Sequence, residues 1–205
     1  MEGRDIKQLT KKPVTSPVRS ASAYMRGVIY GFSREERGSI AVEAVLILPM
    51  MFWTYLVIFS SFHAYRTYAV NQKAAYTVGD MISRETNPID STYLSGTREL
   101  ITYMTSAAPD DVSIRVTSVK YDAGGDKYER EWSEAKGFMG AATTTEVVGW
   151  ADELPVLPDN EVIIVVETSY KYEPPFNVGF YEREVQNFVF TRPRYAPQVC
   201  WNSCN

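Results

Sequence analysis

Histidine is nearly absent from this chain, which excludes several kinds of active site. His63 is the only histidine among 205 residues, and it lies at the end of a long apolar segment. A serine or cysteine nucleophile activated by an imidazole base is therefore improbable. The glycine-rich phosphate loop, the G-x-S-x-G motif and the H-E-x-x-H motif are also missing. We predict that the protein is not an enzyme and uses no cofactor, metal or small-molecule substrate.

Cysteine is almost as rare. The chain has two, Cys200 and Cys204, both within the last six residues. Two thiols without further cysteine or histidine nearby are a poor zinc site. In an oxidising compartment they could form a disulfide, although so small a loop gains little entropy from closure. The residues alone leave two interpretations open, a disulfide or two free thiols in the tail.

Charge is missing from Ala44 to Phe62, a run of 19 residues. As a helix this run is about 28 Å long, close to the thickness of a hydrocarbon core. We predict a transmembrane helix over residues 39–65 in contact with membrane lipid. The helix is expected to continue over residues 66–88, because apolar residues recur there at helical spacing. Pro49 removes one backbone donor and predicts a kink or a loosened turn.

The charges on the two sides of this run differ in sign. Residues 1–38 hold eight basic and four acidic residues, whereas residues 66–205 hold thirteen basic and twenty acidic residues. A basic flank before a single span predicts a cytoplasmic N-terminus and an external C-terminal domain. The acidic domain disfavours nucleic acid as a partner, because phosphate backbones attract basic surfaces.

Residues 89–205 predict a small α+β domain with a mainly antiparallel sheet of about four strands. The spacing of apolar residues indicates a helix over residues 91–106, and a second, short helix is expected over residues 144–154. Strands are expected over residues 112–120, 127–132, 161–172 and 184–191. The first strand alternates apolar and polar residues, which predicts burial of one face. The third has a continuous apolar middle, which predicts a central strand covered on both faces.

Glu43 is the acidic residue that begins the apolar segment, five positions after Gly38. One interpretation places its carboxylate at the membrane interface; the other gives it a function inside the membrane, where acids are costly. Gly38 would let an extended chain enter a peptidase cleft. Cleavage there would make Ser39 the new N-terminus. Its ammonium could pair with Glu43 of a neighbouring subunit, which would offset the desolvation of both charges.

The stretch from Arg37 to Pro49, RGSIAVEAVLILP, resembles the signal of type IV prepilins. More narrowly, it is similar to the TadE/TadF-like minor pseudopilins of the tight-adherence (Flp) pilus. Arg192-Pro193-Arg194 resembles a recurring sequence near the end of that family. Ala44 stands where major Flp pilins carry tyrosine, which favours a minor pseudopilin. The resemblance is firm over residues 37–65, about a seventh of the chain, and slight elsewhere.

The resemblance implies a leader, residues 1–38, that a membrane aspartyl prepilin peptidase removes by cutting after Gly38. It implies partners among other pilins or pseudopilins and the inner-membrane Tad machinery. The C-terminal domain would then be periplasmic. We keep two alternatives: an uncleaved single-span accessory protein of a pilus or secretion complex, and a secreted protein released after Ala69.

Overall fold

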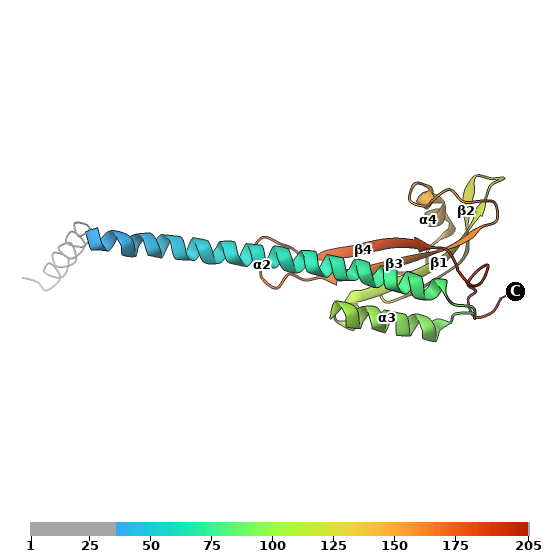
Figure 1. The fold of residues 1–205 in the computed structure, drawn as a ribbon, viewed down its shortest axis with the longest axis horizontal. Helices are drawn as coiled ribbons and strands as arrows, with labels where there is room; N and C mark the ends of the chain where they lie inside the picture. The colour runs from blue at the N-terminus through green and yellow to red at the C-terminus, as the bar shows by residue number, and fades with distance from the viewer. Residues whose placement is uncertain (1–35, 205) are drawn as a thin grey trace, which may run out of the picture. The chain divides into compact units, whose positions relative to one another are not determined.

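A computed structural model describes residues 36–204 of the chain. Most of the predicted leader lies outside the described residues. The chain divides into two compact units, one that ends at Tyr55 and one formed by Leu56–Asn205. Within the described residues the architecture is a long N-terminal helix followed by a small α+β domain, as the sequence predicts (Figure 1).

Helix α2 runs from Glu36 to Ser83, a length of 48 residues. This agrees with the helix predicted over residues 39–65 and its continuation over residues 66–88, although the helix ends five residues earlier. The helix continues through Pro49 without a break, so the proline does not end it; the predicted kink stays a prediction. One stretch of α2 is long and apolar enough to cross a membrane.

The sheet has four strands, all antiparallel, in the order β2-β1-β3-β4. The strands are β1 (Val112–Asp122), β2 (Lys127–Lys136), β3 (Val162–Tyr172) and β4 (Arg183–Thr191). Strand β2 extends four residues beyond the predicted end. The central position predicted for β3 is confirmed, because consecutive residues in its middle are all fully buried: Ile163, Ile164, Val165 and Val166.

The C-terminal part of α2, which belongs to the second unit, and α3 (Ser91–Thr105) lie on one face of the sheet (Figure 1). Small residues on α2, among them Ala74 and Gly79, leave room for close packing, and Gly79 faces Val189 of β4. The core of this face contains residues from both helices and from β1 and β3: Ala74, Val78, Ile82, Leu94, Ile101, Val112, Ile114, Val116, Ile164 and Val166. Burial of this apolar area provides the main stabilisation of the second unit.

The other face is covered by α4 (Thr144–Gly149) and the chain that follows it. The predicted helix over residues 144–154 is therefore shorter, and it continues as one 3₁₀ turn, Trp150–Asp152. Thr143 caps α4 in a capping box with Glu146. The second core contains residues of β1, β3, α4 and the segments around it: Val119, Ala142, Val147, Trp150, Leu154, Leu157, Ile163 and Val165.

The prediction that β1 is buried on one face only is wrong. Nearly every residue from Val112 to Val119 is buried. The fully buried polar residues on its second face, Ser113 and Thr117, are small and satisfied: Thr117 and Ser133 share a hydrogen bond of 2.8 Å between their hydroxyls, and Ser113 donates to the carbonyl of Lys136 at 3.1 Å. Ser133 also accepts a hydrogen bond from the backbone N–H of Ala142, in the segment that covers this face. The alternation of apolar and polar residues along β1 therefore reflects two buried faces that differ in polarity, and not one buried and one exposed face.

A bulge in β2 brings aromatic residues to both cores. Ser118 pairs with Trp132 and Val119 with Arg130, so Glu131 is an extra residue. The extra residue reverses the alternation of side chains along the strand. Trp132 therefore packs on the face of α3, whereas Tyr128 packs on the face of α4.

Candidate functional site

The N-terminal part of α2 holds the residues that the sequence singled out. Gly38 and Ser39 lie in its first turns, since the helix begins at Glu36. From the sequence we expect Gly38 to let an extended chain enter a peptidase cleft, whereas the structure has helix at this position. The first turn of a helix lacks half of its backbone hydrogen bonds, so it unwinds at low cost. A peptidase that needs extended chain at Gly38 would have to unwind this turn.

Glu43 lies on α2 with its side chain exposed. Its neighbours along the helix are exposed as well, and they are almost all apolar. Exposed large side chains occur around the whole circumference: Ile40, Val42, Val45, Leu46, Ile47, Leu48, Met50, Met51, Phe52 and Trp53. A helix that is apolar on every side has no stable state in water unless lipid or other protein surrounds it.

Asn71 anchors the second part of α2 on the sheet. It is fully buried. Its amide nitrogen donates to the backbone carbonyl of Val185 at 3.1 Å, and its amide oxygen accepts from the hydroxyl of Thr168 at 3.4 Å. A buried amide with both ends paired fixes the position of the helix along the strands, since any sliding would leave it unsatisfied.

The sequence interpretation missed Asn71, although a signal was present. Asn71 shares a helical face with Ala74, Ala75 and Val78, the residues that pack on the sheet. A polar residue on an otherwise apolar face indicates a specific hydrogen-bond partner.

His63 and Phe59 join α2 to the far end of the β3–β4 hairpin. The Nδ1 atom of His63 lies 3.2 Å from the hydroxyl oxygen of Tyr172. The ring of Phe59 meets that of Phe176 edge-on, with centroids 5.8 Å apart. The packed part of α2 therefore begins before residue 66, the predicted start of the helical extension.

Arg192 and Arg194, the two arginines of the R-P-R sequence, pair with acids of this same chain. Arg194 lies 3.2 Å from Asp80 of α2, and its backbone N–H donates to the carbonyl of Ser83 at 2.7 Å. Arg192 lies 2.9 Å from Glu161. The Arg194 contacts attach the segment after β4 to the end of α2, whereas Arg192 attaches it to the residue before β3. Both guanidinium groups thus have partners within the described residues, although both side chains are more than half exposed.

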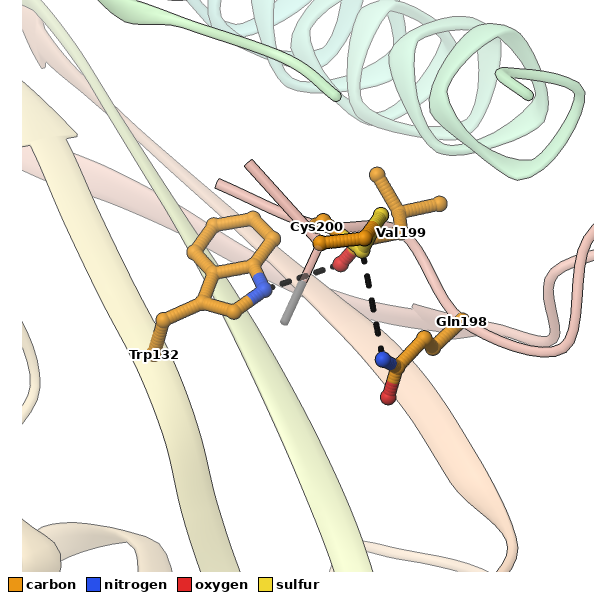
Figure 2. Close-up of a disulfide and its surroundings, with 5 residues drawn as sticks. Trp132, Gln198, Val199 and Cys200 are labelled. Atoms are coloured by element: carbon orange, nitrogen blue, oxygen red, sulfur yellow. Dashed lines mark hydrogen bonds between the residues drawn. A yellow bond between two sulfur atoms is a disulfide. The ribbon is translucent and has the colours of Figure 1, made fainter. Parts of the chain in front are cut away.

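The C-terminal segment contacts the connection between α2 and α3. Cys200 and Cys204 form a disulfide, so the first of the two open interpretations is the one the structure adopts. Ile89 donates to the carbonyl of Cys200 at 3.0 Å and forms a bridge with Trp201. Figure 2 shows Trp132 donating its indole N–H to the carbonyl of Val199 at 2.9 Å, beside the disulfide. The tail is thus part of the domain.

A charged cluster lies on the face of the sheet that α4 covers. Arg115 forms a bidentate pair with Glu167, with N–O distances of 2.5 and 2.6 Å, and contacts Glu146 at 3.3 Å. Arg115 also lies over the ring of Trp150, 5.8 Å from its centroid. The pKa of Glu146 is lowered. The largest cause is the hydrogen bond from the backbone N–H of Thr143, followed by that from the Thr143 side chain and by the charge of Arg115. All the charges are paired, which indicates a contact that holds α4 to the sheet.

No protein-family model, curated protein or solved structure matches this chain. Among residues 36–204, no three His, Cys, Asp or Glu side chains gather where they could hold a metal ion. The features that stand out are therefore the apolar part of α2 with its single carboxylate, and the contacts that hold the rest of α2 to the sheet. This architecture is compatible with that of a pilin.

Proposed function

We propose that the protein is a minor pseudopilin that acts in assembly of a tight-adherence pilus. It has no catalytic activity of its own. Its apolar helix crosses the inner membrane once, and its α+β domain is periplasmic. Prepilin peptidase cuts after Gly38, and the remaining helix packs against other pilins or pseudopilins within the Tad machinery.

The observation that carries this proposal is the exposure of α2 between Ile40 and Trp53. Over this stretch the helix is apolar on every side, with Glu43 as its only charged residue. A soluble domain would have no use for such a surface, whereas a membrane anchor that later packs among like helices needs it. The resemblance of RGSIAVEAVLILP to prepilin signals points to the same conclusion.

Glu43 has a specific part in the proposal. After cleavage, Ser39 carries the new ammonium, four residues before the carboxylate. An ionised carboxylate in lipid is costly, and a neighbour's ammonium offsets that cost only when two helices lie side by side at one axial offset. The pair therefore sets the register of assembly.

N-terminal sequencing of the membrane-bound protein tests the cleavage. The mature chain should begin at Ser39. Replacing Gly38 with a bulky residue, as in Gly38→Trp, should leave the full-length precursor. An intact leader in the wild-type protein of pilus-producing cells would contradict the proposal.

Replacing the carboxylate tests the pairing. Glu43→Gln keeps the size and removes the charge, so cleavage should be normal while assembly into pili fails. Val42→Ala, at the adjacent exposed position, is the matched control and should assemble. Normal pili from the Glu43→Gln variant would rule out the pairing.

A second candidate is an uncleaved single-span protein that serves a pilus or secretion complex. One observation favours it: the Gly38–Ser39 bond lies in a helical turn. The same N-terminal sequencing separates the two candidates, because only the second retains the leader.

A further inference from the structure

A groove of about 760 Å³ lies beside α2 just after its apolar stretch. One wall is the helix, and the other is the β3–β4 connection, residues 173–182, with the strand ends that flank it. We call it the hairpin groove. The lining residues that matter here are Ser61, Tyr65, Tyr68, Phe180, Tyr181 and Arg183.

The position of this groove along α2, relative to the proposed span, indicates at which depth of the membrane it lies. This step rests on the proposed membrane span. The charge-free run, residues 44–62, extends about 28 Å as a helix, which nearly fills a hydrocarbon core of about 30 Å. The residues at its end and just beyond it, from Ser61 to Tyr68, then belong to the headgroup region on the side of the domain.

The chemistry of the groove fits that region. Tyr65 and Tyr68 combine an apolar ring with a hydroxyl, as do residues of interfacial aromatic belts. Across from them, Tyr181 is 83% exposed. An isolated soluble domain has no partner for so many aromatic side chains around one groove, whereas the boundary between lipid and water accommodates both their rings and their hydroxyls.

Arg183 adds a cationic group to this lining. Its side chain is exposed, and among the residues that the structure describes its guanidinium forms no ion pair. Of the described residues that line the groove, Glu182 is the one acid. A guanidinium in a groove that tyrosines also line is suited to a phosphate group, because its planar fork binds two phosphate oxygens.

We infer that the hairpin groove holds the phosphate-bearing headgroup of a phospholipid from the membrane that α2 crosses. Arg183 contacts the phosphate, and the tyrosines of the groove contact the glycerol and ester region. The β3–β4 connection is thus a second membrane contact besides the span. With Phe176 against Phe59, it holds the domain close to the lipid surface.

A photoreactive phenylalanine analogue, placed at one position at a time in the full chain, tests this inference in phospholipid vesicles. Tyr181 reports on the groove. Tyr103 of α3 is the matched control, because it is 84% exposed and lies on a helix that does not line the groove. Phe52 reports on the span itself. Adducts are identified by mass spectrometry.

We expect lipid adducts at Phe52 and Tyr181, with the yield at Tyr181 at least tenfold above that at Tyr103. Adducts at Phe52 with equal yields at Tyr181 and Tyr103 would overturn the inference and leave the span intact. Adducts of Tyr181 to a second copy of the chain, in place of lipid, would also overturn it. Without adducts at Phe52, both the span and the inference fail.

The phosphate contact has a test of its own. In vesicles that contain equal amounts of phosphatidylglycerol and an uncharged glycolipid, Tyr181 should label the phospholipid about fivefold more. The additional substitution Arg183→Gln should reduce this preference to nearly none, while Arg183→Lys keeps part of it. Equal labelling of the two lipids by the parent chain would exclude phosphate recognition.

Discussion

The two parts of α2 have similar local structure and opposite surroundings. From Ile40 to Trp53 the helix is apolar on all sides, and its side chains are exposed. From Asn71 to Ser83 one face is buried, and that face consists of small or branched residues and one paired amide. The difference teaches that helix formation alone does not decide what a helix does. The distribution of apolar residues around it decides whether it packs on its own domain or on something else.

The largest difference should appear between two isoleucines of this helix. Ile82 is fully buried, whereas Ile58 is 63% exposed. Ile82→Ala removes buried methyl groups and leaves a cavity, so it should lower the free energy of unfolding by about 2–5 kcal/mol. Ile58→Ala should change it by no more than about 0.5 kcal/mol. Urea unfolding of the detergent-solubilised protein measures both. Equal effects would remove the distinction between the two parts.

Replacing Asn71 should cause the next largest loss of stability. This substitution tests whether the paired amide holds the packed part of α2 in place on the sheet. Asn71→Ala leaves the carbonyl of Val185 and the hydroxyl of Thr168 without their partner, at a cost of about 1–3 kcal/mol. The adjacent Gln72 is exposed, so Gln72→Ala serves as the control and should cost about 0.5 kcal/mol at most. Thermal unfolding of both variants compares them. A neutral Asn71→Ala would mean that apolar packing alone holds the helix.

The disulfide should contribute less to the stability of the domain than Asn71 does. Cys200→Ser with Cys204→Ser opens a loop of only a few residues, and the loop-entropy estimate allows about 2 kcal/mol at most. The tail keeps its backbone contacts to Ile89 and the indole hydrogen bond of Trp132. We therefore expect the double variant to fold with a slightly lowered unfolding temperature. Complete loss of folding would show that the covalent bond, rather than these contacts, holds the tail.

A change of pH should have the smallest effect on stability of the changes considered. Near neutral pH the effect should be slight, and it should grow as the pH falls. Two carboxylates in the second unit have a pKa below the ordinary value of 4.5: Glu146, through Thr143 and then Arg115, and Glu184, through the hydroxyl of Ser169. A lowered pKa in the folded state adds stability above the unfolded-state value, and this stability is lost as the pH falls through the folded-state value.

Unfolding measured from pH 7 down to pH 3 checks this dependence. Glu146→Gln should destabilise the domain at pH 7 and differ progressively less from the parent as the pH falls below 4.5. Glu153 lies near α4 and is exposed, and among the described residues its carboxylate forms no hydrogen bond or ion pair, so Glu153→Gln is the control. A constant difference between Glu146→Gln and the parent at every pH would exclude the carboxylate as the cause.

The sequence predicted the elements of the domain well, because each has a local pattern. The spacing of apolar residues indicated α2, α3 and β1, and the continuous apolar middle of β3 placed it at the centre of the sheet. Errors arose where a partner distant in the chain decides the outcome. Burial of both faces of β1 depends on α4 and its flanking segments, which lie more than twenty residues further along.

For the candidate site, the sequence by itself determined the apolar run with its single carboxylate, because the absence of charge is a property of the chain alone. The prediction of cleavage after Gly38 also comes from local residues. Only the tertiary structure decided where α2 passes from exposed to packed. That boundary depends on contacts such as Phe59 with Phe176 and Asn71 with Val185, which join residues more than a hundred positions apart. Long-range contacts of this kind leave no periodic trace in either segment alone.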